Sequence, residues 1–320
     1  MRVAGRVRIV AAVAVAVAAS ALVINACGPV TPSVTFTHSQ FEGFDVISYV
    51  PAQPTAIAYV FHGSQGSANF AEKVETVDVL NELIGRGYGF VATESTERTG
   101  NKRWNVSNPS LQTNPDLARL TRLHQHLIDT TGVGASTPIV GIGMSNGSRF
   151  VTLFGQTWSD AGFPVKAIAP YMGRIAAPVE QSGGLTVPSF FVTAENDFTS
   201  PPGPIVVNYN DTAAAGTPAE LRVAEERNLT NARFLRIPGI DGTEAQEIFD
   251  ALVDAGIWNA AGERIVTIDE AVAMAANVDL PPSVNPQRAE IVNQCALVLA
   301  VHQMRADYKV PMADFFADFL

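Results

Sequence analysis

The chain has 320 residues and a formal net charge of −10, with 31 acidic and 21 basic residues. At this length it can bury a full hydrophobic core, either as one large α/β domain or as two small ones. Because an acidic surface repels phosphate groups, the composition argues against nucleic acid or an anionic membrane surface as a binding partner.

The first 27 residues have the composition of a secretory signal. Three arginines precede an Ala/Val-rich apolar run over residues 9–24, and Cys27 follows the small Ala26. This order resembles a bacterial lipoprotein signal in which Cys27 becomes the lipidated N-terminus. The alternative is a signal cut near Ala26 with no lipid. A membrane-spanning anchor is disfavoured because the run is short for a bilayer.

We therefore expect an extracytoplasmic protein whose only membrane contact is a lipid anchor to the bacterial cell envelope, with a secreted soluble form as the alternative. Residues 28–34 have the composition of a tether, and residues 35–320 form the predicted domain. Without residues 1–27 the chain holds 18 basic and 31 acidic residues, a net charge of −13. So acidic a surface favours an uncharged substrate. Apart from Cys27, Cys295 is the one cysteine, so no disulfide is expected within the domain.

Apolar runs and helical patterns alternate along residues 35–200. Several of the runs are apolar throughout, which is typical of strands covered on both faces. The alternation predicts an α/β fold with a parallel sheet and helices on both of its faces. The predicted strands are residues 35–38, 45–50, 56–61, 89–93, 139–142, 165–170 and 187–193, and the clearest helices are residues 68–86 and 116–131.

Beyond residue 201 the pattern is less regular. Two β-like runs, residues 219–223 and 233–237, compete to be the last strand, and the sequence leaves the choice open. Helices are predicted near residues 244–255, 268–276, 286–304 and 312–320. Residues from about 225 to 298 are therefore predicted to be a mostly helical insertion.

Residues 143–147, Gly-Met-Ser-Asn-Gly, fit the pattern G-x-S-x-G. A buried strand is predicted before this segment and an amphipathic helix after it, as the pattern requires when its serine sits on a sharp strand-to-helix turn. Ser145 is therefore the candidate nucleophile, and the alternative is an ordinary turn serine.

An acyl-transfer site also needs donors for an oxyanion. One is expected from the backbone N–H of Asn146, directly after the nucleophile. A second is expected from the loop after residues 56–61, where Ser64 is preferred and Gln65 competes. His62 precedes that loop and is expected to support it by a hydrogen bond.

The remaining parts of the site are an acid and a base. Asp197 follows a predicted buried strand, so it should lie at the same sheet edge as Ser145, with Glu195 as the runner-up. His302 is the candidate base because it completes the order Ser…Asp…His. The pair His124 and His126 is two residues apart on a helix and does not share a face, which argues against a metal site.

With these residues in place, the chain resembles the α/β-hydrolases over about residues 36–320. Secreted esterases of the polyhydroxybutyrate depolymerase and feruloyl esterase type are similar to this chain in three segments. These are residues 143–147 (Gly-Met-Ser-Asn-Gly), residues 103–105 (Arg-Trp-Asn) and the helix start at Asp116. The resemblance implies a mostly parallel eight-stranded sheet. It also implies hydrolysis of small or polymeric carboxylic esters without a metal or organic cofactor. It makes Ser145 the nucleophile, Asp197 the acid and His302 the base.

The chain departs from the family pattern after the last strand. Asp241 lies near the place where a histidine is expected, so His302 must return to the site from the far end of the helical insertion. Because of this departure, one alternative is a lipoprotein that keeps the hydrolase fold but only binds a ligand or partner. A peptidase, thioesterase or acyltransferase on the same fold is another.

Aromatic residues in or near the loops at the sheet edge are candidates for a substrate pocket. Trp104, Phe198 and Tyr171, together with Met172, could line an acyl or aromatic pocket, or could be ordinary loop packing. The sequence indicates no oligomeric state.

Overall fold

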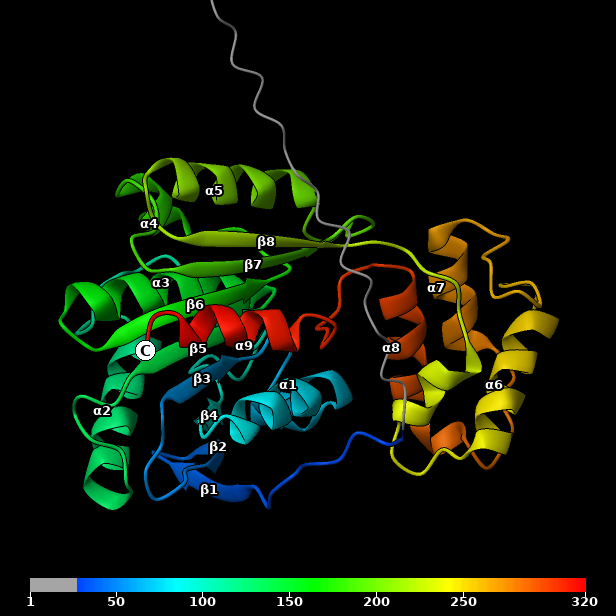
Figure 1. The fold of residues 1–320 in the computed structure, drawn as a ribbon, viewed down its shortest axis with the longest axis horizontal. Coiled ribbons are helices and arrows are strands. Elements are labelled where there is room, and N and C mark those ends of the chain that lie inside the picture. Colours follow the sequence, from blue (N-terminus) through cyan, green and yellow to red (C-terminus); the bar gives the residue numbers. More distant parts are fainter. Residues whose placement is uncertain (1–27) are drawn as a thin grey trace, which may run out of the picture.

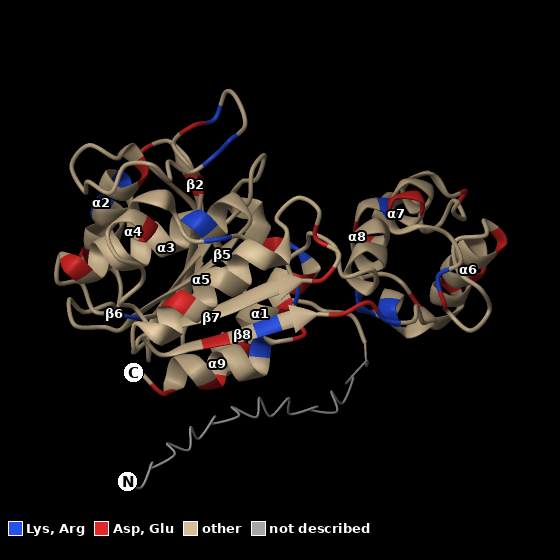
Figure 2. Cartoon of the chain, turned by 90° about the horizontal axis from the view of Figure 1, so that it is seen from above, with Lys and Arg blue, Asp and Glu red and all other residues tan. Residues whose placement is uncertain are grey.

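The computed structural model describes residues 28–320. The predicted signal and Cys27 lie outside this part of the chain. Within residues 28–320, no helix is both long enough and apolar enough to cross a membrane. Acidic residues are spread over both the sheet and the helices beside it (Figure 2).

Eight strands form one sheet in the order β1-β2-β4-β3-β5-β6-β7-β8. The first two strands pair antiparallel with their neighbours, and all later pairs are parallel. The predicted α/β architecture, with its mostly parallel eight-stranded sheet and helices on both faces, is confirmed. The strands are β1 (Thr37–Phe41), β2 (Phe44–Tyr49), β3 (Ile57–Phe61), β4 (Gly89–Thr93), β5 (Ile139–Met144), β6 (Val165–Tyr171), β7 (Ser189–Ala194) and β8 (Ala219–Ala224).

Helices cover both faces of the sheet, because successive side chains of a strand point to opposite faces. In β3, Ala58 and Val60 belong to one hydrophobic cluster, whereas Ile57, Tyr59 and Phe61 belong to another. The first cluster packs under α1 and α9, and the second under α2, α3, α4 and α5 (Figure 1). The helices around the sheet are α1 (Val74–Gly85), α2 (Pro115–Thr130), α3 (Asn146–Asp160), α4 (Ala177–Gln181), α5 (Pro202–Ala214) and α9 (Lys309–Ala317).

A helical lobe, which we define as residues 229–299, lies beside the sheet (Figure 1). It has a hydrophobic cluster of its own, with the buried Phe234, Ile248 and Trp258 among its members. Capping boxes at Asp241 and Thr267 fix the starts of two of its helices. Its helices are η2 (Asn231–Arg236), α6 (Gly242–Asp254), α7 (Ile268–Asn277), η3 (Asn285–Gln287) and α8 (Arg288–Val298).

Two details of this region differ from the sequence-based expectations. The run at residues 233–237 forms most of the 3₁₀ helix η2 and not a strand, so β8 is the last strand of the sheet. The three-residue spacing of Arg233 and Arg236 brings both side chains to one side of that helix, where both bind Glu75. The helix expected over residues 286–304 ends at Val298, and the chain turns at Ala300, whose φ is 52°.

Candidate active site

Ser145 occupies a strained turn between β5 and α3. Its φ of 59° and ψ of −115° lie outside the regions that ordinary L-residues populate, and such strain persists only where surrounding contacts impose it. The Ser145 N–H donates to the carbonyl of Tyr171 on the neighbouring strand β6, 2.9 Å away. The turn is therefore tied to the sheet, as the G-x-S-x-G pattern requires.

The glycines of the pattern allow a close approach of backbone segments. A Cβ atom on Gly143 would lie 2.0 Å from the carbonyl oxygen of Gly147. A Cβ atom on Gly147 would lie 2.3 Å from the carbonyl oxygen of Phe61 at the end of β3. Any side chain at either position would force α3 away from the sheet, so the two glycines set the position of Ser145.

The loop after β3 lies against the serine. A Cβ atom on Gly63 would lie 3.2 Å from Cβ of Ser145. The backbone N–H of Gln65 is already used, since it donates to the carbonyl of Asn101 at 2.7 Å, whereas that of Ser64 has no partner within residues 28–320. Of the two candidate oxyanion donors in this loop, the structure therefore leaves Ser64 available.

Asn146 is the first residue of α3, where backbone N–H groups have no partner within the helix. Its side-chain Oδ1 accepts a hydrogen bond from the N–H of Trp104 at 2.7 Å. The indole Nε1 of Trp104 in turn donates to the carbonyl of His62 at 3.0 Å. Trp104 thus links the loop after β3 to the start of α3, on either side of the serine.

His62 supports the loop as the sequence predicts. Its Nε2 accepts from the N–H of Ser95 at 3.2 Å, so the ring proton is on Nδ1, which contacts the Gly63 carbonyl at 2.6 Å. Burial lowers the pKa of His62 to about 4. The ring is therefore neutral at pH 7 and has both nitrogens occupied.

Asp197 and His302 are in direct contact. Asp197 follows β7 and is 2 % exposed, and its Oδ2 lies 2.7 Å from Nδ1 of His302. The other oxygen, Oδ1, accepts from the N–H of Ser200 at 2.7 Å. The runner-up Glu195 is exposed and accepts from the N–H of Glu226 instead.

The segment that carries His302, residues 299–308, joins α8 to α9. Asn196, beside the acid, holds its start through two hydrogen bonds, from Asn196 N to the Ala300 carbonyl at 3.1 Å and from Nδ2 to the Leu299 carbonyl at 2.9 Å. Leu299 packs in the core of the helical lobe, whereas Ala300 packs in the core under α1 and α9. The loop after β7 therefore fixes both the ring and the backbone of the candidate base.

A buried ionic network holds the other end of this segment. The Glu75 carboxylate, on α1, accepts from the backbone N–H of Ala306 at 2.8 Å and from Arg233 and Arg236 of the helical lobe. No local sequence pattern indicates this network, because its charged residues lie far apart in the chain. The further members are Asp78, Gln294, Arg305, Asp307 and Lys309.

Ser145 and His302 line one cavity of about 600 Å³. Within residues 28–320 no hydrogen bond joins the Ser145 hydroxyl to His302. The two side chains are related by lining the same cavity. The cavity lies between the loop after β3, residues 94–115, the start of α3 and the loops after β6 and β7. It is lined by Ser64, Thr96, Glu97, Arg103, Trp104, Asn105, Val106, Ser107, Pro115, Asp116, Ser145, Asn146, Arg149, Met172, Gly173, Thr199, Ser200 and His302.

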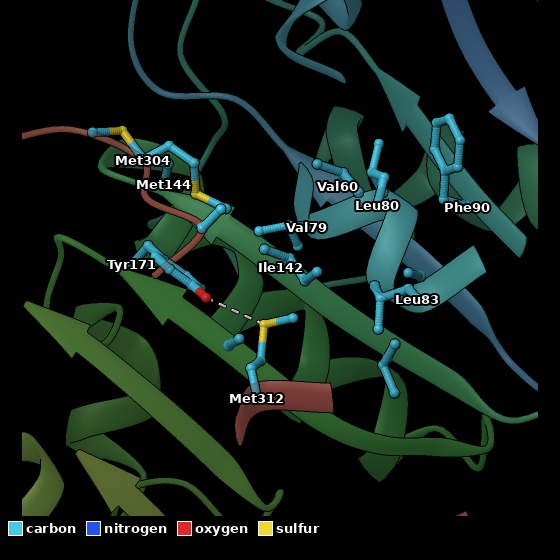
Figure 3. Packing of buried hydrophobic residues seen from close by; sticks show 14 of the residues in the cluster. Val60, Val79, Leu80, Leu83, Phe90, Ile142, Met144, Tyr171, Met304 and Met312 are labelled. Atoms are coloured by element: carbon cyan, nitrogen blue, oxygen red, sulfur yellow. Dashed lines mark hydrogen bonds between the residues drawn. The ribbon is translucent and has the colours of Figure 1, made fainter. Parts of the chain in front are cut away.

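The candidate pocket residues lie in different places. Trp104 and Met172 line the cavity. Tyr171 does not, because its side chain is buried on the α9 side of the sheet, where its hydroxyl donates to Sδ of Met312 (Figure 3). Phe198 is 68 % exposed and also lies outside the lining.

The long polar segment over residues 94–115 is anchored by Asp116, which is fully buried. Its two carboxylate oxygens accept from the N–H groups of Thr96 and Asn105, each at 2.6 Å. Asn114 caps α2 directly before it. This segment is therefore an ordered wall of the cavity.

The other histidines have structural surroundings. Nδ1 of His124 lies 2.9 Å from the Tyr59 hydroxyl, and burial lowers the pKa of His124 to about 4. His126 lies beside the ring of Phe41. Within the described part of the chain, no group of three or more His, Cys, Asp or Glu side chains is placed to hold a metal ion.

No protein-family model and no curated protein matches the chain. Solved structures that it resembles include a thermostable esterase, with a TM-score of 0.43, 16 % identity, and coverage of 60 % of this chain and 55 % of that one. Another is Est1E from Butyrivibrio proteoclasticus with ferulic acid bound, with a TM-score of 0.42, 14 % identity, and coverage of 59 % and 89 %. A third is an acetyl xylan esterase from Aspergillus awamori, with a TM-score of 0.41, 12 % identity, and coverage of 53 % and 76 %.

Proposed function

We propose that the protein is a serine hydrolase of carboxylic esters. Ser145 is the nucleophile, His302 the general base and Asp197 the acid that orients it. The observation that carries the proposal is the 2.7 Å contact between His302 and the buried Asp197, in a cavity that the strained Ser145 also lines.

The reaction proceeds in two steps. Nε2 of His302 takes the proton of the Ser145 hydroxyl while Oγ attacks the ester carbonyl carbon. The negative charge moves to the carbonyl oxygen, where the N–H groups of Ser64 and Asn146 bind it. When this intermediate collapses, the alkoxide leaves and takes the proton from His302, and an acyl group remains on Ser145.

Water completes the cycle. His302 takes a proton from a water molecule, which attacks the acyl carbon and re-forms the oxyanion. Collapse releases the carboxylic acid and returns the proton to Ser145. Asp197 holds the proton of His302 on Nδ1, so Nε2 is free to act as the base in both steps.

Two physical features of the site support this assignment. The strain at Ser145 is imposed by Gly143, Gly147 and β6, so the backbone of the nucleophile stays in place during the reaction. The oxyanion donors are backbone groups fixed by a helix start and by a turn. Donors fixed in this way are worth about 10²- to 10³-fold each in kcat.

The test is hydrolysis of 4-nitrophenyl acetate and butyrate by the wild type and by Ser145→Ala, together with covalent labelling by a fluorophosphonate. We expect the substitution to lower kcat by several orders of magnitude and to abolish labelling. Hydrolysis at the wild-type rate by Ser145→Ala would refute the assignment. A folded wild type that is neither labelled nor active would favour a binding protein, and a panel of thioesters and peptides separates the related acyl-transfer activities.

We further propose that the protein acts outside the cytoplasm, attached through Cys27. Support comes from the basic start, the apolar run and the cysteine after Ala26. Intact-mass analysis of the membrane fraction tests this, since Cys27→Ser should remove the lipid mass and release the protein.

A further inference from the structure

Arg149 differs from the arginines elsewhere in residues 28–320. Twelve of the fourteen arginines in this part of the chain donate to a side chain or a backbone carbonyl. The guanidinium groups of Arg149 and Arg174 make no hydrogen bond and no ion pair within residues 28–320. Arg174 is exposed, so water satisfies it. Nε of Arg149, in contrast, is buried without a partner. Nε of Arg119, Arg233 and Arg305 is buried without a partner too, but the guanidinium groups of those three arginines make other hydrogen bonds, whereas that of Arg149 makes none within residues 28–320.

An unpaired buried donor costs free energy, and a ligand that accepts from the guanidinium would offset this cost. Arg149 lines the cavity that holds Ser145 and His302. It lies one helical turn after Ser145, whose carbonyl accepts the Arg149 N–H at 3.2 Å. Because long side chains on a helix point toward its N-terminus, this position directs the guanidinium toward the serine.

The carboxylates of the cavity are already occupied. Asp116 accepts from two backbone N–H groups, and Glu97 accepts from the N–H groups of Gly100 and Arg103. Burial lowers the pKa of Arg149, and the nearby Arg174 and Arg103 lower it further, whereas Glu180 raises it. Glu180 itself accepts from Asn208 and makes no ion pair with Arg149. The cavity thus offers an open cation beside the nucleophile, in a protein with a large excess of acidic residues.

We propose that the site takes esters that carry a free carboxylate, and that Arg149 binds this carboxylate through its planar guanidinium. The inference rests on the proposed ester hydrolysis and names its substrate class. It replaces the expectation, drawn from the acidic surface, of an uncharged substrate. A guanidinium matches a carboxylate in two parallel hydrogen bonds, which gives orientation as well as affinity.

The experiment compares two pairs of esters that differ in the carboxylate. Mono-4-nitrophenyl glutarate and 4-nitrophenyl pentanoate differ on the acyl side, and 4-acetoxybenzoate and its methyl ester differ on the alcohol side. The measured quantity is the ratio of kcat/KM for the charged ester to that for the neutral one, so a general change in activity cancels. We expect a ratio of about 10 to 100 for at least one pair, the size of one charge-assisted contact.

Variants decide whether Arg149 causes the preference. Arg149→Gln should bring the ratio to about one, and Arg149→Lys, which keeps the charge but not the planar fork, should give an intermediate value. Arg122→Gln is the matched control, because Arg122 pairs with Glu42 on the surface and lies outside the cavity. This variant changes the net charge equally and should leave the ratio at the wild-type value.

A binding measurement keeps the inference separate from the proposed reaction. Sodium glutarate should raise the Tm of the wild type and of Ser145→Ala, but not that of Arg149→Gln, relative to sodium chloride of equal ionic strength. A ratio of one or less for both pairs, or a ratio that Arg149→Gln leaves unchanged, would overturn the inference. If no ester is hydrolysed, the reaction fails as a proposal, and the glutarate titration alone decides the anion site.

Discussion

Nδ1 of His302 lies 2.7 Å from Oδ2 of Asp197, although 105 residues separate them along the chain. The second carboxylate oxygen is held by the N–H of Ser200. Because both oxygens have fixed partners, the Asp197 carboxylate cannot rotate without breaking a hydrogen bond. It therefore selects the tautomer of His302 that carries its proton on Nδ1, and Nε2 remains free to accept a proton.

Replacing Asp197 by asparagine should lower kcat by roughly 10³- to 10⁴-fold, because the amide stabilises the wrong tautomer of His302 while preserving the shape of the site. Steady-state hydrolysis of 4-nitrophenyl butyrate measures the loss. Glu195→Gln is the control: Glu195 is exposed, and an amide oxygen can still accept from Glu226 N. That variant should stay within about twofold of the wild type. Equal losses in the two variants would contradict the assignment of Asp197.

The free energy of unfolding should decrease as the pH is lowered below about 7. Burial lowers the pKa of both His62 and His124 from 6.5 to about 4. Between these values the unfolded chain binds more protons than the folded one, so acidification favours unfolding. Each histidine contributes a slope of up to about 1.4 kcal/mol per pH unit, and this contribution is fully present above about pH 7.

The His124→Gln variant isolates one of these contributions, since glutamine can still bond to the Tyr59 hydroxyl but does not titrate. Urea unfolding at several values between pH 4.5 and 7.5 gives the free energy of unfolding of both proteins. The stability deficit of the variant should shrink as the pH falls through this range. A deficit that is independent of pH would show that His124 is not held neutral in the folded protein.

Removing the charge of Glu75 should destabilise the protein and slow the reaction. In Glu75→Gln the partly buried Arg233 and Arg236 lose the charge of a shared buried partner, and breaking a buried ion pair typically costs about 3–5 kcal/mol. The backbone of Ala306, four residues beyond His302, loses a charged acceptor, so kcat should fall in samples that near-UV circular dichroism shows to be folded.

Glu72→Gln provides the comparison for Glu75, because within residues 28–320 the one ion pair of Glu72 is with His38, at an exposed site. Its loss should cost no more than about 1 kcal/mol, with activity unchanged. Urea unfolding measures both variants. A Glu75 variant as stable and active as the Glu72 variant would mean that the network does not hold the His302 segment.

Gly147→Ala should abolish folding or cost at least about 4 kcal/mol, because the added methyl would lie 2.3 Å from the carbonyl oxygen of Phe61 and 2.5 Å from that of His62. Gly203→Ala is the matched change. Gly203 is helical and has no atom within 4 Å of the added methyl, so this variant should gain about 0.4–1 kcal/mol. Soluble yield and thermal unfolding distinguish the two. A stable Gly147→Ala protein would mean that α3 can move away from β3.

The sheet was predictable because its central strands are apolar on both faces and short. The same argument places Asp197 beside the serine edge, since a loop that follows a parallel strand emerges there. The position of Tyr171 at a strand end makes it a candidate for the pocket. The alternation of faces, which a sequence position alone does not fix, turns its side chain toward Met312.

The contacts that hold His302 were not predictable. They depend on the break at Ala300, on the loop around Asn196 and on a carboxylate in α1, and no periodic pattern joins these three segments. The η2 region was ambiguous because residues 233–237 form a short run rich in apolar residues, which is also typical of a strand. Tertiary contacts with Glu75 are compatible with the 3₁₀ form and outweigh that local pattern.

Because the helical lobe has a hydrophobic core of its own, we expect the lobe to be able to unfold before the sheet does. His302 lies directly after the point where the chain leaves that core for the core under α1 and α9. A sub-global opening of residues 229–299 would therefore withdraw the proton acceptor while the serine, its turn and the sheet stay folded. Catalytic activity then depends on the folded state of the helical lobe. In a denaturant titration, we expect activity to disappear before the tryptophans packed on the sheet become exposed.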